Sequence, residues 1–256
     1  MIMIDSFSFM GAEISPYDFF NVLGFFLLFA FNIFQRGKAF IGYNGTISKH
    51  NTQTKMPNFV AKKYAVIFVL SCVQFFSGVV MNILIGDIFN NGSDNYFGFA
   101  IFAPMIFMLF CKLFKLDAIG YLDAFTPAYA LSLVSFKIGC FCAGCCSGAD
   151  IGPTLYYPVS GNNQFPIQLL ECFVACCIFV FLLYYRRKAP KGTMHAMYLI
   201  LYSSTRFCTE FLRSEANAFL IFKWYHVWCL IGIAVGIAEF FILKKHYTEL
   251  QKNQTA

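Results

Sequence analysis

Seven stretches of this chain are apolar over a length that can cross the hydrocarbon core of a bilayer. A membrane-spanning helix needs roughly 20 mostly apolar residues, because each residue advances the helix by about 1.5 Å. Of the 256 residues, 59% are hydrophobic and only 12% are charged, a balance outside that of soluble domains. The chain is therefore predicted to be an all-α integral membrane protein of about seven transmembrane helices, a single polytopic domain over residues 1–256. The predicted spans cover residues 19–34, 64–89, 96–113, 121–138, 166–185, 194–212 and 219–243.

The lysines and arginines outside the apolar stretches indicate the orientation of the chain. Fifteen of the 19 basic residues lie at the connections after the first, third and fifth stretches or in the C-terminal tail. With seven spans these connections share one side of the membrane, and basic connections face the cytoplasm. The sequence predicts an outer N-terminus and a cytoplasmic C-terminus. Residues 1–18 lack the basic start of a cleavable signal peptide, so the first span is expected to remain. The dispersed basic residues give no sign of a nucleic-acid partner.

The sixth apolar stretch carries three charged side chains on one helical face. Arg206, Glu210 and Arg213 follow one another at spacings of four and three residues, which align them on one side of a helix. Ionised groups at membrane depth are costly unless they are paired or face a cavity. Because guanidinium groups suit phosphate and carboxylate, the stripe predicts a site for an anionic ligand near the outer leaflet. The alternative is an ion pair that ties two helices together.

A glycine- and cysteine-rich run follows the fourth apolar stretch. Residues 137–148 read KIGCFCAGCCSG, and the glycines predict a tight turn, which is allowed at membrane depth only inside protein. We expect an outer-leaflet re-entrant segment near residues 137–165. Cys140, Cys142, Cys145 and Cys146 lack the paired spacing of structural zinc sites, so no metal is predicted. A disulfide among them is an alternative, because the segment faces outward in this topology.

Several short motifs occur in order along the chain. Asp123 begins a D-A-F-T-P element, the KIGCFCAGCCSG run follows, residues 165–171 read FPIQLLE, and the sixth stretch holds R-x3-E-x2-R. In order and spacing these motifs resemble the D-x-x-A-P, G-R-x-G-N-x-x-N-G-E-x-x-G, H-P-S-Q-L-Y-E and R-x3-E-x2-R elements of the prolipoprotein diacylglyceryl transferase family. Tyr17 resembles the tyrosine of that family's N-terminal Tyr-Gly pair. The resemblance covers about residues 15–213 and implies seven spans with an outer N-terminus.

This resemblance implies a reaction and its partners. Family members transfer the diacylglyceryl group of phosphatidylglycerol to the lipobox cysteine thiol of preprolipoproteins and release glycerol 1-phosphate, with no cofactor. The implied setting is a multi-pass protein of the bacterial plasma membrane, in contact with phosphatidylglycerol, the lipobox substrate and membrane lipids. Breaking the bond to phosphate places negative charge on the leaving group, which fixed cations stabilise. A proton acceptor is also needed, because the thiolate is the reactive form of the acceptor.

Residue roles follow from the same resemblance. The predicted catalytic residues are Arg206, which grips the phosphate, Lys137, which aligns with the family's signature Arg, and Glu210, which orients the arginines or accepts a proton. For Glu210 a structural ion pair is the alternative role. The predicted substrate-binding residues are Arg213, Tyr17, Gly139, Cys140, Gly144, Gly148, Asp123, Gln168 and Glu171.

The chain departs from the family pattern at several signature positions. The family's His aligns with Phe97, its first Asn with Cys140 and its Glu with Cys145. Lys137 keeps the positive charge of the family's Arg and loses its bidentate fork. One reading is a divergent subgroup with the same reaction. The alternatives are a related transferase with a different lipid or acceptor, a non-catalytic protein that binds or transports an anionic lipid, and a membrane thiol–disulfide protein.

Overall fold

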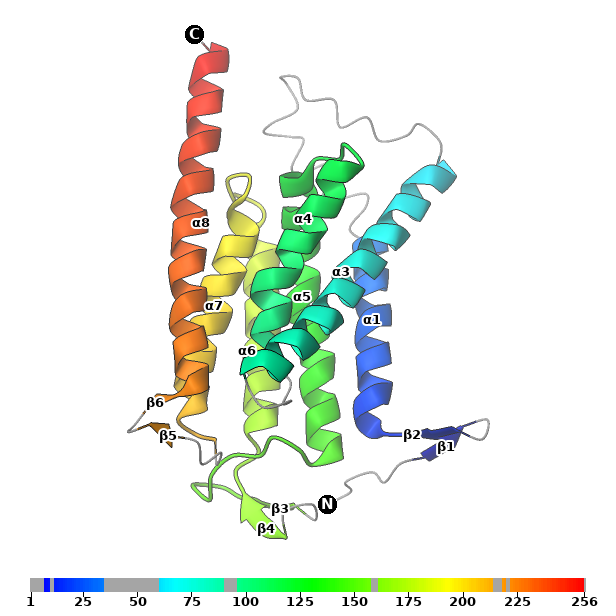
Figure 1. The fold of residues 1–256 in the computed structure, drawn as a ribbon, viewed down its shortest axis with the longest axis vertical. Helices are drawn as coiled ribbons and strands as arrows, with labels where there is room; N and C mark the ends of the chain where they lie inside the picture. The colour runs from blue at the N-terminus through cyan, green and yellow to red at the C-terminus, as the bar shows by residue number, and fades with distance from the viewer. Residues whose placement is uncertain are drawn as a thin grey trace.

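The described part of the chain folds into a bundle of helices with three short hairpins at one end (Figure 1). The computed structural model describes residues 7–9, 12–34, 60–89, 96–157, 161–213, 218–219 and 222–255. The helices are α1 (Pro16–Phe34), α3 (Val60–Phe89), the π-helix η2 (Gly98–Phe102), α4 (Ala103–Leu113), α5 (Ala118–Ala143), α6 (Ile167–Tyr185), α7 (Thr193–Glu210) and α8 (Trp224–Thr255). The antiparallel hairpins pair β1 (Phe7–Phe9) with β2 (Ala12–Ile14), β3 (Leu155–Tyr157) with β4 (Asn162–Gln164), and β5 (Ala218–Phe219) with β6 (Phe222–Lys223).

Five of the described helices are long and apolar enough to cross a membrane. They are α1, α5, α6, Tyr64–Ile88 of α3 and Trp224–Tyr247 of α8. The third predicted span forms a shorter apolar helix, Gly98–Leu113, and the sixth forms α7, which is too polar to be among the five. The all-helical membrane class is therefore confirmed. The count of seven spans and the orientation of the termini stay predictions.

Local sequence signals set the start of α1 and both ends of α5. At the start of α1, the Ser15 hydroxyl accepts a hydrogen bond from the backbone N–H of Asp18 at 3.1 Å. Asp117 caps α5, its carboxylate accepting from the backbone N–H of Gly120 at 3.1 Å. Gly144 ends α5 with a left-handed φ of 70°, a conformation that glycine adopts without a steric cost. The first seven residues of the predicted re-entrant segment, 137–143, therefore form the last turns of α5, and the chain leaves the helix only at Gly144.

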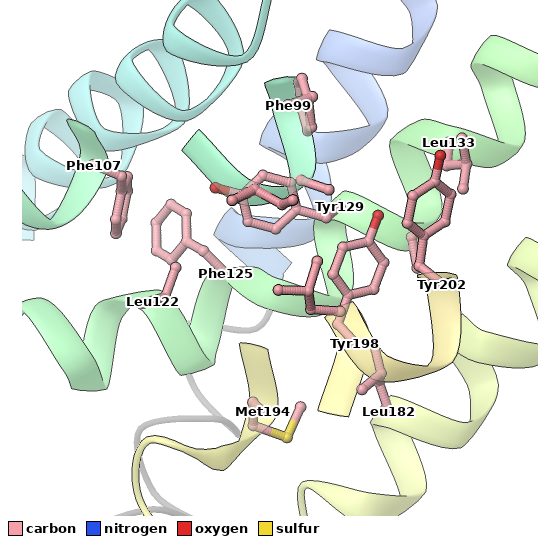
Figure 2. Close-up of a cluster of buried hydrophobic side chains, with 14 of the residues drawn as sticks. Phe99, Phe107, Leu122, Phe125, Tyr129, Leu133, Leu182, Met194, Tyr198 and Tyr202 are labelled. Carbon is pink, nitrogen blue, oxygen red and sulfur yellow. The ribbon is translucent and has the colours of Figure 1, made fainter. Parts of the chain in front are cut away.

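An aromatic core fills the space between the helices (Figure 2). Tyr129 of α5 stands at its centre, edge-on to Phe99 with ring centroids 5.2 Å apart and stacked on Tyr198 at 5.9 Å. The outward faces are apolar too, with Phe26, Phe173 and Phe241 between 58% and 66% exposed. Helices that are apolar all round are typical of membrane spans, since lipid tails cover the outer face. The other labelled side chains of this core are Phe107, Leu122, Phe125, Leu133, Leu182, Met194 and Tyr202.

Candidate anion-binding site

A buried carboxylate, that of Glu171, stands at the meeting point of three cations. The Nζ atom of Lys137 lies 2.8 Å from its Oε2 atom, and an Nη atom of Arg213 lies 3.0 Å from the same oxygen. The guanidinium of Arg206 donates to the other oxygen, Oε1. None of the four side chains is more than 8% exposed. Charges this deeply buried persist only when they are paired in close geometry.

Two of the three residues of the predicted stripe, Arg206 and Glu210, lie on α7, whereas Arg213 follows the end of this helix and joins the cluster from its bridge with Gly148. Arg206 and Glu210 are one turn apart, and an Nη atom of Arg206 lies 2.7 Å from the Oε2 atom of Glu210. Arg206 therefore joins two carboxylates, that of α6 and that of its own helix. Three cations face two carboxylates, so the fully ionised cluster carries a net charge of +1. A buried surplus of positive charge favours an anionic ligand.

The fold brings these side chains together from three helix ends. Lys137 lies in the last two turns of α5, Glu171 in the first turn and a half of α6, and Glu210 is the last residue of α7. These ends lie at the side of the bundle that carries the hairpins (Figure 1). The sequence predicts which residues share a face of α7, whereas the packing of α5 and α6 against that face supplies Lys137 and Glu171.

Gly148 holds Arg213 at the cluster through the backbone. The two residues form an isolated antiparallel bridge, and the N–H of Gly148 donates to the carbonyl of Phe165 at 2.9 Å. A Cβ atom on Gly148 would stand 2.8 Å from the carbonyl oxygens of both Phe165 and Leu212. No real Cβ atom tolerates such contacts, so only glycine fits this position. Negative charge on Glu171 raises the pKa of Arg213 above its ordinary value, although burial alone would lower that pKa.

Gly139 and Gln168 join structural elements around the site. A Cβ atom on Gly139 would come within 2.8 Å of the Cβ of Phe20, so glycine here permits the close approach of α1 to α5. The Nε2 group of Gln168 donates to the carbonyl of Cys145 at 2.5 Å, and its Oε1 accepts from the hydroxyl of Tyr157 at 3.0 Å. Through these hydrogen bonds, the fully buried side chain of Gln168 links the cysteine-containing turn to α6.

A cavity of about 370 Å³ opens beside the cations. Lys137, Arg206 and Arg213 line one part of it, and aromatic side chains line much of the remainder. This division suits an amphipathic ligand, with an acidic group against the cations and an apolar part against the rings. The other residues that line the cavity are Tyr17, Tyr96, Phe97, Phe136, Cys140, Ala143, Cys145, Cys146, Tyr202 and Tyr225.

The structure does not bring Asp123 to this cavity. Its carboxylate accepts hydrogen bonds from the backbone N–H groups of Gly192, at 2.5 Å, and Met194, at 3.1 Å, which begin α7. Asp123 and Lys137 lie on one continuous helix, and a separation of 14 positions corresponds to about 21 Å along its axis. The structure thus places Asp123 at a capping position far from the cations, and its contact with substrate stays a prediction. The predicted span over residues 121–138 already places Asp123 and Lys137 at opposite ends of one helix.

Some residues of the site have no motif in the sequence. Thr209 donates to Glu171 at 3.4 Å, and the ring of Tyr225 lies 5.3 Å from the guanidinium carbon of Arg206. Helical spacing from Arg206 identifies Thr209, three residues on, and Tyr202, four residues back, as neighbours on α7. Tyr225 belongs to α8, so only the packing of α8 against α7 shows its position.

Comparison with known proteins agrees with these motifs. The family model of prolipoprotein diacylglyceryl transferase matches residues 6–242. The phosphatidylglycerol–prolipoprotein diacylglyceryl transferase of Clostridium tetani is 34% identical over 131 residues, which are 46% of this chain and 53% of the relative. The enzyme of the same name from Chlorobaculum tepidum is 33% identical over 156 residues, 56% of this chain and 53% of the relative. These alignments span about half the length of each relative. Because the family model covers most of the chain, the protein belongs to the prolipoprotein diacylglyceryl transferase family.

Proposed function

We propose that this protein transfers the diacylglyceryl group of phosphatidylglycerol to the lipobox cysteine thiol of preprolipoproteins. The observation that carries the proposal is the buried cluster of Lys137, Arg206 and Arg213 on one wall of an otherwise largely aromatic cavity. Family membership adds the reaction, since the relatives' names specify phosphatidylglycerol and prolipoprotein. A lipid with one phosphate and two acyl chains matches the charge and the apolar walls of the cavity.

The reaction is a displacement at carbon. The sulfur of the acceptor forms a bond to the glyceryl carbon that carries the phosphate, and the carbon–oxygen bond to phosphate breaks. The electron pair of that bond stays on the phosphate oxygen, so the leaving glycerol 1-phosphate gains one negative charge while the thiol proton is released. Fixed cations in a water-poor site stabilise this developing charge, and one well-placed donor is worth about 100-fold or more in rate.

Each charged residue of the cluster has a proposed part in this step. Arg206 binds the phosphate, because it lines the cavity while Glu171 and Glu210 hold its guanidinium in place. Lys137 and Arg213 share Oε2 of Glu171 and also line the cavity, so both reach the same anion. Glu171 thereby positions the three cations. Glu210 orients Arg206 through the ion pair between them.

The membrane setting completes the proposal. We place the hairpin end of the bundle at the outer leaflet of the bacterial plasma membrane, with seven spans and a cytoplasmic C-terminus. The charge distribution of the loops supports this orientation. The cation cluster then lies where phosphatidylglycerol head groups and a translocated lipobox cysteine both reach it.

Substitution of Arg206 tests the proposed function directly. We expect Arg206→Ala to lower the transfer of labelled diacylglyceryl from phosphatidylglycerol to a lipobox peptide by about 100-fold or more. The control is Arg187→Ala, because Arg187 is exposed and follows the opposite end of α6. Complementation of a strain that lacks its transferase checks the acceptor in cells. Wild-type transfer by the folded Arg206→Ala variant contradicts the assignment.

A further inference from the structure

Three cysteine sulfur atoms meet at the edge of the cavity. Cys140 lies in the last turn of α5, and Cys145 and Cys146 follow the left-handed residue that ends this helix. Their sulfur atoms all lie within 4.8 Å of one another, and all three residues line the cavity. Each of the 11 cysteines of the chain lies within the described residues and is a free thiol. The three sulfurs are therefore available to a ligand that enters the cavity.

The backbone holds these sulfurs in place from several sides. Cys146 has a φ of 59°, in the left-handed region, which costs a non-glycine residue about 1 kcal/mol or more. The thiol of Cys145 points at the carbonyl of Cys140, 3.6 Å away, and the side chain of Gln168 binds the carbonyl of Cys145 at 2.5 Å. Buried partners thus keep this turn in a conformation that is costly for a non-glycine residue. The turn brings together three cysteines whose spacing in the sequence is unlike that of structural zinc sites.

Two cations line the cavity beside the triangle. Lys137 and Arg213 share the cavity wall with all three cysteines, and nearby positive charge favours a thiolate over a thiol. The thiolate is the form of cysteine that binds metal ions. Cys140 is buried, Cys145 is half-buried and Cys146 is exposed, so an ion reaches the triangle from the open side.

We propose that Cys140, Cys145 and Cys146 form a three-thiolate binding site for a thiophilic divalent cation such as Zn²⁺, with the fourth ligand position open to the cavity. Zinc–sulfur bonds of about 2.3 Å in a tetrahedral site place sulfurs about 3.8 Å apart, so small side-chain rotations close the triangle on an ion. Structural zinc sites have four protein ligands, whereas catalytic ones have three and an open position. The cysteine triangle is of the second kind.

The open ligand position gives the site a role in catalysis, and this part of the inference rests on the proposed transferase function. The acceptor cysteine would bind the cation through its sulfur and lose its proton to water, because a metal-bound thiol is deprotonated. The sulfur then forms its bond to the glyceryl carbon as the carbon–oxygen bond breaks, and the electron pair leaves with the phosphate. The carboxylates of Glu171 and Glu210 are both engaged with Arg206. The cation therefore supplies the thiol activation that the cluster otherwise lacks among its described residues.

Metal binding is measured first, without reference to activity. The full-length protein is purified in detergent under reducing, metal-free conditions and titrated with Cd²⁺, whose bond to thiolate gives an ultraviolet charge-transfer band. We expect one ion per chain, and an affinity about 100-fold or more lower in Cys146→Ser. Even the loss of a group that only hydrogen-bonds to a metal ligand lowers metal affinity by about 10- to 100-fold. Cys142→Ser is the matched control, because Cys142 precedes Gly144 on the same helix and does not line the cavity.

The results of this titration decide the proposal. Cys146 is exposed, so serine at this position leaves the fold intact, and the apparent melting temperature of each variant verifies it. Equal Cd²⁺ binding by wild type and Cys146→Ser overturns the site, as does the absence of a charge-transfer band in the wild type. A protein mass two hydrogens below that of the fully reduced chain also overturns the site if the deficit maps to two of these cysteines, because those two then form a disulfide.

The open ligand position is tested with Co²⁺, whose visible spectrum reports the ligands of the ion. A lipobox peptide added to the Co²⁺-loaded protein is expected to shift the spectrum, and the same peptide with serine in place of cysteine is not. An unchanged spectrum with the cysteine peptide refutes the open position. Full transfer activity in chelated wild type and in Cys146→Ser refutes thiol activation while the transferase function stands. A bound ion in a protein without any transfer activity refutes the transferase function instead.

Discussion

Replacement of Glu171 by glutamine removes the one negative charge on which three buried cations converge. The side chain keeps its shape, while Lys137, Arg206 and Arg213 lose their common partner. Two unit charges about 3 Å apart attract by roughly 5 kcal/mol at an effective dielectric constant of 20. The cost of burying the charges offsets much of this attraction, and removal of one partner of a buried pair typically costs about 3–5 kcal/mol. For a chain of this size, that loss lowers the melting temperature by about 10 °C.

The assay is thermal unfolding of the detergent-solubilised protein, followed as an apparent melting temperature. Glu249→Gln is the control, because it makes the same chemical change in an exposed pair, where the Lys245–Glu249 distance is 4.0 Å and the side chains are 79% and 61% exposed. Such exposed helical pairs contribute only about 0.3–0.5 kcal/mol, so we expect a shift of about 1 °C. Equal shifts in the two variants refute the argument that Glu171 organises the cluster.

Added lipid separates electrostatics from packing in the same experiment. Glu171→Gln raises the net charge of the ionised cluster from +1 to +2, as inferred from its three cations and two carboxylates. Phosphatidylglycerol is therefore expected to restore more of the melting temperature of this variant than of the wild type, because its phosphate replaces the lost charge. Zwitterionic phosphatidylcholine serves as the control lipid. Equal recovery with both lipids indicates a packing defect and contradicts an anion site.

Three further predictions concern the surroundings of the cluster. Gly148→Ala forces a Cβ atom to within 2.8 Å of two carbonyl oxygens, so we expect weaker phosphatidylglycerol binding than in Gly24→Ala, whose Cβ would meet its nearest neighbour at 3.4 Å, an ordinary contact; equal affinities contradict the role of the bridge to Arg213. Asp123→Asn weakens the cap of α7 and is expected to lower the apparent melting temperature by an amount equivalent to about 1 kcal/mol, whereas an unchanged melting temperature with a raised KM favours direct contact with substrate. Hydrogen bonds from the thiols of Cys140 and Cys145 and the charges of Arg213 and Lys137 lower the pKa of the Cys146 thiol, so between pH 8 and pH 6 its alkylation rate in the metal-free protein should fall by less than that of free cysteine, which falls roughly 80-fold; a parallel fall contradicts the lowered pKa.

The sequence by itself determines the features that depend on spacing along one helix. The apolar stretches predict the helices, because length and hydropathy decide what can lie in a bilayer. Arg206 and Glu210 pair as the helical period predicts, and Gly144 ends α5 as a left-handed glycine does. The glycines of the cysteine-rich run are likewise at positions where a side chain would be excluded or strained.

Contacts between separate helices are decided only by the tertiary structure. Glu171, more than Glu210, organises the cations, because the start of α6 packs between the ends of α5 and α7. Asp123 lies at the far end of α5, where its carboxylate caps α7. The three cysteine sulfurs meet because a left-handed turn folds the chain back on the last turn of α5. The physical reason is the same in each case: helical periodicity relates residues of one helix, while the partners across the bundle depend on how whole helices pack and where each one ends.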